Sequence, residues 1–304
     1  LCLAGSATFE AHAQGIDIRA KAQTLMFSWS RLTPTEQQVA LKELTGDLAP
    51  RHRDAVVKFF TTNMHLQTSV SLFNGKDLAG WDTWLGKPFK GDKAVGLNTD
   101  PQKVYTVVDV DGKPAIRISG EIFGALTTKE EYENYHFKLE FKWGEKRWPP
   151  REKAVRDSGL LYHCVGPHGA QGTFWMRSQE LQIQEKDCGD YWSVAGAIVD
   201  VEAERKDGKG PLVYKKGGQK FTVPSKDTGS RIIKHPDNEK PTGEWNTIEL
   251  YTFGQTSVHI VNGKVNMILT GSRHKVDGKE VALTKGKIQL QSEGAEVFYR
   301  NISI

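Results

Sequence analysis

Two stretches of the sequence place short polar side chains at every second position. In the first, Glu180, Gln182 and Gln184 alternate with Leu181 and Ile183. Successive side chains of an extended strand point to opposite faces, so the three polar groups share one face and the two apolar groups share the core face. Carboxylates and amides arranged in this way can hydrogen-bond sugar hydroxyls in pairs. The pattern indicates a carbohydrate site, although a plain solvent-facing strand shows the same alternation.

A second strand pattern near the end of the chain has the same character. Gln289, Gln291 and Glu293 share one face, opposite Ile288 and Leu290. Two such rows favour a sugar site on the concave face of one sheet. We assign the following side chains to substrate binding: Gln182, Gln184, Gln291 and Glu293.

Aromatic side chains could complete such a site, because their faces stack on the C–H faces of sugars. Trp148, Trp175 and Trp192 fall at predicted strand ends or in loops. We expect Trp175 and Trp192 to rim the site and to bind substrate. Alternation along its strand favours a core position for Trp143.

The elements that must position these groups are strands. From residue 69 to residue 304 the hydrophobic period is two, and the segment 135–143 alternates plainly. Two predicted hairpins turn at Asp111-Gly112 and Asn262-Gly263, dipeptides that suit tight hairpin turns. Many short strands without intervening helices predict an antiparallel β-sandwich of the jelly-roll type. Residues 203–244 are rich in Gly, Lys, Pro and Asp, and we expect a long irregular rim or lid.

The chain before residue 69 has a different pattern. Residues 16–68 predict a small helical segment, with one helix starting where Thr33 caps, Pro34 opens the first turn and Glu36 completes a capping box. Another helix is expected to start at Pro50. Residues 1–15 resemble the remnant of a signal peptide. We therefore expect an exported protein, periplasmic or extracellular, with a lipid anchor at Cys2 as a further option.

Composition excludes several classes of protein. The 304 residues carry a formal net charge of +4 with both signs well mixed, and we find no nucleic-acid-binding motif. No apolar run reaches the roughly 20 residues that a transmembrane helix needs.

Cys164 and Cys188 could form a disulfide or remain two buried thiols. The oligomeric state cannot be read from the sequence.

An ordered set of motifs resembles the 3-keto-disaccharide hydrolase family, formerly a domain of unknown function. The resemblance covers roughly residues 70–304 and implies a sandwich similar to concanavalin A and to glycoside hydrolase family 16. Asp157 stands where the family usually has Asn. The motifs are Leu72-Phe73-Asn74-Gly75-Lys76-Asp77-Leu78-Ala79-Gly80-Trp81, Asp157-Ser158-Gly159-Leu160-Leu161-Tyr162, Glu180-Leu181-Gln182-Ile183, Gly196-Ala197-Ile198, Glu244-Trp245-Asn246-Thr247, Val261-Asn262-Gly263, Ile288-Gln289-Leu290-Gln291 and Arg300-Asn301-Ile302.

The resemblance implies a small oligosaccharide or glycoside substrate oxidised at C3. The ketone acidifies the C2 hydrogen, so a base can remove it and the C1 aglycone can leave, with water addition giving net hydrolysis. Glu180 is the candidate base, and His163, placed on the same face as Leu161, is the candidate acid or metal ligand. Lys142 could face the enolate and bind substrate. The cofactor is unknown, and a divalent metal could stabilise the enolate.

Two other functions fit the same residues. The face could belong to a non-catalytic carbohydrate-binding module. The chain could also be a family 16-like endo-glucanase, since Glu180 and Glu185 match the first and last carboxylates of the family 16 motif E-x-D-x-x-E. Gln182 stands where that motif has Asp, which disfavours ordinary retaining hydrolysis.

Overall fold

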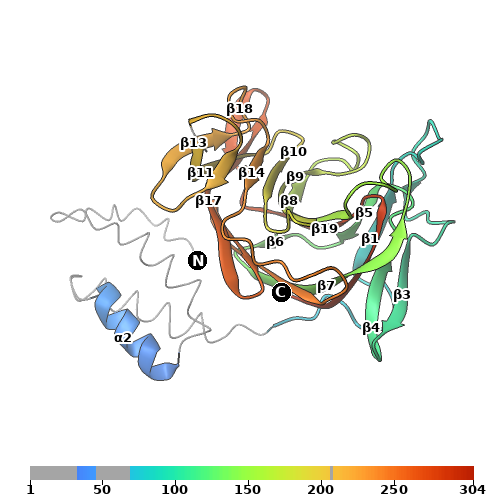
Figure 1. Cartoon of the computed structure of the whole chain (residues 1–304), viewed down its shortest axis with the longest axis horizontal. Coiled ribbons are helices and arrows are strands. Elements are labelled where there is room, and N and C mark those ends of the chain that lie inside the picture. Colours follow the sequence, from blue (N-terminus) through green and yellow to red (C-terminus); the bar gives the residue numbers. More distant parts are fainter. Residues whose placement is uncertain (1–32, 46–68, 206–207) are drawn as a thin grey trace. The chain divides into compact units, whose positions relative to one another are not determined.

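The computed structural model describes residues 33–45, 69–205 and 208–304 (Figure 1). The chain divides into two units, Leu1–Thr68 and Ser69–Ile304. Each unit is described by itself.

The described part of the first unit is the helix α2 (Pro34–Thr45). The predicted capping box is present: the Glu36 main-chain N–H donates to Thr33 Oγ1 (3.3 Å), and Thr33 N–H donates to Glu36 Oε2 (2.7 Å). The expected signal-peptide remnant, Cys2 and the helix from Pro50 lie outside the described residues. Within the described ranges, no helix combines the length and the apolar character needed to cross a bilayer.

The second unit is a β-sandwich of two antiparallel layers. The first layer carries the candidate site. Across this layer the strands are β2 (Gly96–Leu97), β1 (Trp81–Leu85), β5 (Gly124–Thr128), β19 (Lys285–Ser292), β8 (Asp157–Val165), β9 (Arg177–Gln184), β10 (Tyr191–Val194) and β14 (Arg231–Ile233). The short strand β6 (Tyr132–Glu133) pairs with the start of β19.

The second layer packs against the first. Its strands in order are β3 (Tyr105–Val110), β4 (Lys113–Ile118), β20 (Ala295–Ser303), β7 (His136–Arg147), β15 (Asn246–Phe253), β16 (Thr256–Val261), β17 (Lys264–Val276), β11 (Ile198–Arg205) and β13 (Gln219–Val223). β18 (Lys279–Ala282) pairs with the end of β17. β12 (Leu212–Tyr214) pairs with both β11 and β14, so the two layers are continuous at this edge.

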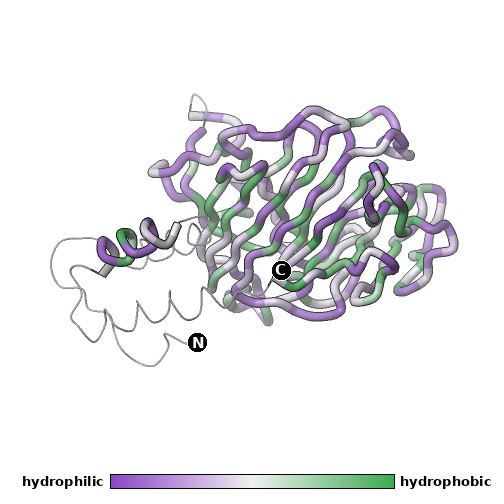
Figure 2. Tube along the Cα trace, turned by 90° about the horizontal axis from the view of Figure 1, so that it is seen from below, coloured by the Kyte–Doolittle hydropathy of each residue, from purple (hydrophilic) through white to green (hydrophobic). Residues whose placement is uncertain are grey.

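The main core lies between the layers. Leu181 and Ile183 of β9 face it, as their alternation predicts, and meet apolar side chains from β7, β15 and β20. Trp143 is also in this core, as expected. Each fully buried Leu or Ile stabilises the fold by about 2 kcal/mol. Figure 2 shows the result along the chain, with hydrophobic residues concentrated in the strands and mostly hydrophilic connecting loops.

Both predicted hairpins are present. β3 and β4 are joined by Asp111 and Gly112, and β16 and β17 by Asn262 and Gly263. All four residues have positive φ, between 51° and 76°. This backbone matches the twist of the flanking strands, which is why Asn-Gly and Asp-Gly are favoured there.

The prediction of a long irregular segment over residues 203–244 is only partly right. Residues 203–244 are not wholly irregular, because β12, β13 and β14 lie there and enclose a second core around Tyr191 and Val201. These strands are only three to five residues long, too short for a clear period-two signal.

Cys164 and Cys188 are both buried and free, so the structure shows the alternative of two buried thiols.

Candidate functional site

A pocket of about 280 Å³ opens on the face of the first layer that points away from the core. Its walls come from β8, β9, β10 and β19 and from the loops that follow β7, β8 and β19. Small-molecule sites usually measure about 300–1,000 Å³, so this pocket suits a small ligand rather than a long polymer strand. The lining residues used below are Arg151, Asp157, Trp175, Glu180, Gln182, Gln184, Trp192, Gln291 and Glu293.

Strand register explains why these groups meet. On the adjacent strands β8 and β9, Asp157 lies opposite Gln184, and Gly159 lies opposite Gln182. Residues opposite each other share a face, so Asp157 joins the polar row of β9. The pocket therefore contains Glu180, Gln182, Gln184, Gln291 and Glu293 together, as the two alternating rows predict.

Gly159 provides the open space at the centre of the site. A Cβ atom at this position would lie 2.3 Å from Glu180 Oε1 and 2.4 Å from Gln291 Oε1. Both side chains occupy the volume that any other residue would fill. The glycine of the Asp157-Ser158-Gly159 motif is therefore needed for space, and its φ is not positive.

Three carboxyl groups line the pocket and oppose one another's ionisation. Burial raises the pKa of Glu180 well above its ordinary value, and the charge of Asp157 raises it further. Burial likewise raises the pKa of Asp157 to about 7, against the opposing effect of the Arg151 guanidinium. Burial, then Asp157 and Glu180, raise the pKa of Glu293. Neighbouring carboxylates cannot all ionise readily, so the site can hold a base and a protonated acid at the same pH.

Arg151 supplies the positive charge. It is the only cation among the pocket-lining residues, all of which lie in the described range 69–205 or 208–304. Its guanidinium Nη2 lies 2.6 Å from Asp157 Oδ2 and donates to Gln184 Oε1 at 2.8 Å. A fixed guanidinium beside a pocket can stabilise negative charge that develops on a bound substrate.

Two buried acceptor atoms in the pocket have no donor within the described part of the chain. They are Asp157 Oδ1 and Gln291 Oε1, on residues that are 4% and 1% exposed. Buried polar atoms are nearly always hydrogen-bonded in native proteins. A ligand that brings hydroxyl donors would satisfy both.

The two expected aromatic side chains lie at the pocket and are held in place. Trp175 Nε1 donates to the Gly124 carbonyl at 3.0 Å, and its ring stacks on Phe123 with centroids 6.3 Å apart. The Arg231 guanidinium lies over the Trp192 ring at 5.8 Å. Their roles in substrate binding stay predictions.

His163 lies outside the pocket, so its expected position on the face of Glu180 is wrong. A register shift between Tyr162 and Val165 breaks the alternation of β8, and His163 has a φ of 53°. Its ring instead packs edge-on against Tyr162, with centroids 5.3 Å apart. Burial lowers the pKa of His163 to about 4, so the imidazole is neutral at physiological pH.

Lys142 is also remote from the pocket. It lies on β7 in the second layer, where its Nζ donates to Asp111 Oδ2 at 3.1 Å and lies over the Trp245 ring at 5.9 Å. β7 pairs with β15 and β20, not with the site strands. The polar face of β7 and the polar face of β9 point away from the shared core in opposite directions.

Asp157 and Arg151 were not predicted as site residues. Asp157 had a usable signal, because Leu160 marks the core face of β8 and places Asp157 and Gly159 on the other face. Arg151 lies in the irregular segment between β7 and β8, where no periodicity indicates the direction of a side chain. Its place follows only from the three-dimensional contacts.

The expected divalent metal stays a prediction. The oxygen donors of the pocket are of the kind that hard cations take. In the described ranges, however, no three His, Cys, Asp or Glu side chains are placed to hold a metal ion. We therefore derive no step through a metal.

Comparisons with known proteins give one family. Residues 68–304 match the family model described as 3-keto-alpha-glucoside-1,2-lyase-like domain. No curated protein matches the chain.

Solved structures of similar fold include three from bacteria. A protein of Parabacteroides distasonis, provisionally described as a glycosyl hydrolase, is 20% identical (TM-score 0.43), with 80% of this chain and 95% of that chain covered. The β-glucanase of Bacillus licheniformis is 11% identical (TM-score 0.37; 78% and 97% covered). The carbohydrate-binding module CBM66 of Bacillus subtilis is 8% identical (TM-score 0.36; 65% and 89% covered).

Proposed function

Since this chain belongs to the family of 3-keto-alpha-glucoside-1,2-lyase-like domains, we propose that it is a carbohydrate-active enzyme that cleaves the glycosidic bond of 3-keto glycosides. The observation that carries the proposal is the small pocket with three carboxyl groups of raised pKa, those of the buried Asp157 and Glu180 and that of Glu293, beside one guanidinium. Proton abstraction next to a ketone needs these parts: a base, an acid and a positive charge.

Glu180 is the proposed base. It removes the C2 proton, and the C2–H electrons form the C2=C3 double bond while the C3 carbonyl becomes an enolate oxygen. A base works best when its pKa is near the working pH, and burial moves the pKa of Glu180 in that direction. Arg151 is the proposed partner of the enolate oxygen, in the role first given to Lys142.

The second step expels the aglycone. The enolate re-forms the C3 carbonyl, a double bond forms between C1 and C2, and the C1–O bond breaks with its electron pair on the leaving oxygen. Glu293 is the proposed acid that protonates this oxygen, because burial, and then the charges of Asp157 and Glu180, raise its pKa and favour its protonated form. The product is an unsaturated 3-keto sugar, and addition of water to it gives net hydrolysis.

The alternative of a family 16-like endo-glucanase is less well supported. Glu185, which that alternative requires as the second carboxyl group, is engaged elsewhere. Its Oε1 accepts from Arg156 Nη1 at 2.8 Å and from Thr242 Oγ1 at 2.7 Å, and Glu185 does not line the pocket.

Export to the periplasm or cell exterior, expected from the first residues, remains part of the proposal.

Product analysis by NMR tests the function. We expect cleavage of a 3-keto disaccharide and no cleavage of its unoxidised parent, because only the ketone acidifies C2. Each reaction is run as prepared, with chelator and with added divalent metal. Activity that survives chelation is expected if Arg151 alone stabilises the enolate, whereas loss on chelation and recovery with metal would assign that role to a metal. Binding of both sugars with cleavage of neither would favour the carbohydrate-binding module.

A further inference from the structure

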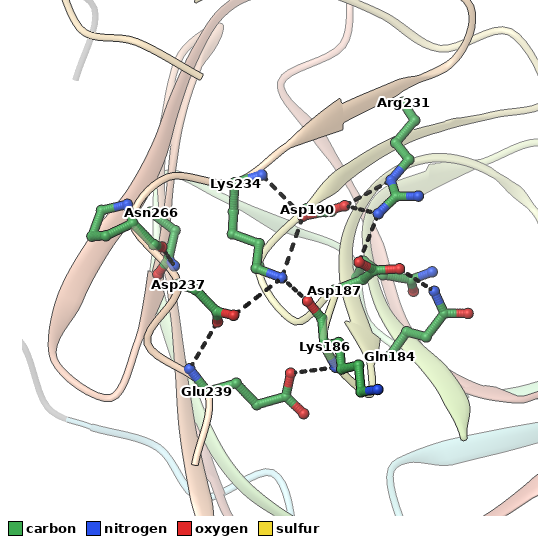
Figure 3. Close-up of polar contacts among 12 residues, drawn as sticks. Gln184, Lys186, Asp187, Asp190, Arg231, Lys234, Asp237, Glu239 and Asn266 are labelled. Atoms are coloured by element: carbon green, nitrogen blue, oxygen red, sulfur yellow. Dashed lines mark hydrogen bonds and ion pairs between the residues drawn. The ribbon is translucent and has the colours of Figure 1, made fainter. Parts of the chain in front are cut away.

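A chain of polar contacts leads from Asp190 to Gln184 (Figure 3) and continues through Arg151 to Asp157 in the pocket. It starts at Asp190, whose side chain is fully buried directly before the start of β10. Arg231 Nε donates to Asp190 Oδ2 at 2.7 Å, and the Lys234 main-chain N–H donates to Asp190 Oδ1 at 2.9 Å. A buried carboxylate with charged donors is costly to disturb, so Asp190 is a fixed anchor for Arg231.

Arg231 carries the contact to the next carboxylate. Its Nη2 lies 2.6 Å from Asp190 Oδ2 and 2.8 Å from Asp187 Oδ1. Asp187 Oδ2 in turn accepts from Gln184 Nε2 at 2.8 Å. Figure 3 shows Arg231 between the two aspartates, with Gln184 beyond Asp187.

The last two contacts reach the catalytic carboxyl cluster. Because the Gln184 amide uses its NH₂ group toward Asp187, its oxygen is left facing Arg151 and accepts from Arg151 Nη2 at 2.8 Å. The same nitrogen of Arg151 lies 2.6 Å from Asp157 Oδ2. The orientation of one amide therefore decides whether Arg151 meets an acceptor or a donor.

We propose that Asp187 and Arg231 are positioning residues of the site: they set the orientation of the Gln184 amide, which holds Arg151 against Asp157. The inference rests on the proposed function for its catalytic meaning, and on the contacts alone for its physical content. We call the series Arg231, Asp187, Gln184 and Arg151 the relay.

The substitution Asp187→Asn separates the relay from a simple charge effect. Arg231 is a pure donor, so it selects the oxygen of the new amide and turns its NH₂ group toward Gln184. Gln184 must then flip, present its oxygen to residue 187 and present its own NH₂ group to Arg151. Arg151 loses its acceptor and its hold on Asp157.

The relay and the simple charge effect predict opposite shifts in the pKa of Asp157 when Asp187 is replaced by asparagine. Removing the negative charge of Asp187 by itself lowers the pKa of Asp157, because that charge raises it in the wild-type protein. Loss of the Arg151 contact raises it. The other charged groups that face Asp157 are Glu180 and Glu293 from the pocket and Arg231 from β14; the substitution keeps all three residues, and Asp190 still holds Arg231.

Carboxyl ¹³C NMR titration of the full chain, labelled at aspartate, measures this directly, and the Asp157→Asn spectrum assigns the signal. We expect the Asp157 midpoint to be higher in Asp187→Asn than in the wild-type protein measured in the same way. The control is Asp200→Asn, which removes a comparable half-buried partner of Arg273 (3.0 Å) outside the pocket and should leave the midpoint in place. An unchanged or lower midpoint in Asp187→Asn would overturn the relay.

The measurement needs no substrate, so it stands even if 3-keto glycosides are not cleaved. If Asp187→Asn does not fold, as judged by thermal unfolding, Gln184→Leu tests the last step of the relay. It removes the amide oxygen that accepts from Arg151 without changing any charge, so an upward shift of the Asp157 midpoint is expected, and an unchanged midpoint would overturn the relay.

Discussion

Glu180→Gln is expected to abolish glycosidic-bond cleavage while the sugar still binds. Glutamine keeps the size of the side chain and its hydrogen bond with Gln291, but it cannot accept a proton from C2. Loss of a positioned general base typically lowers the rate about 10²- to 10⁴-fold. Steady-state rates with a 3-keto disaccharide measure the effect, and isothermal titration of the same sugar measures binding. Wild-type activity in the variant would remove Glu180 from the mechanism.

The same variant should be more stable than the wild type at alkaline pH. The folded-state pKa of Glu180 lies above its ordinary value of 4.5, so the protonated form is favoured by folding. That contribution is fully present below pH 4.5 and is lost as the pH rises through the folded pKa. Glutamine has no such loss, so the gain in Tm should be larger at pH 8 than at pH 4. A variant that is less stable at both pH values would mean that Glu180 supports the fold.

Gly159→Ala is expected to inactivate the protein without unfolding it. The added Cβ falls 2.3 Å from Glu180 Oε1 and 2.4 Å from Gln291 Oε1, so both side-chain ends must move. Flexible side-chain ends move at little cost to the fold, and the backbone of Gly159 suits alanine. Displacement of a base by about 1 Å can cost roughly 10²-fold in rate. We expect a loss of that order in kcat with a Tm close to that of the wild type.

Gly286→Ala is the matched contrast on the neighbouring strand β19. Its Cβ would meet main-chain atoms, 2.5 Å from the His163 carbonyl carbon and 2.7 Å from the Cys164 nitrogen. Backbone cannot yield as a side-chain end can, so this variant should lose stability. If Gly159→Ala kept full activity, the space above Gly159 would not be where Glu180 acts.

The carboxyl groups of the pocket reduce the stability of the fold as the pH rises. Burial raises the pKa values of Asp157, Glu180 and Glu293, and each then stabilises the folded state less as the pH rises. Proteins commonly retain such destabilising groups where function needs them. The pocket is therefore better understood as a site selected for chemistry than as a part of the core.

Most of the correct sequence predictions rest on the alternation of polar and apolar residues along the strands. Leu181 and Ile183 are the observed core face of β9, and Glu180, Gln182 and Gln184 meet in the pocket. The Asp-Gly and Asn-Gly turns were predictable because few other dipeptides accept two positive φ values. Local patterns of this kind specify strands, faces and hairpins without reference to the rest of the chain.

The wrong or missing predictions concern residues whose positions depend on the fold as a whole and not on alternation within one strand. A register shift in β8 turns His163 away from the predicted face, and no residue type in the sequence marks it. Lys142 was predicted near Glu180 because the sequence cannot tell which of the two layers contains β7. Arg151 reaches the pocket from an irregular segment, so only the fold brings it to Asp157.

The fate of a deuterium atom at C2 tests the central claim most directly. A 3-keto disaccharide deuterated at C2 is incubated in ordinary water with the protein, beside a blank without protein, and the products are measured by mass spectrometry. The account predicts that the cleaved sugar has lost the deuterium, because Glu180 removes it before the aglycone leaves. Retention of deuterium at C2 in the released sugar would contradict the account, since cleavage would then have occurred without breaking the C2–H bond.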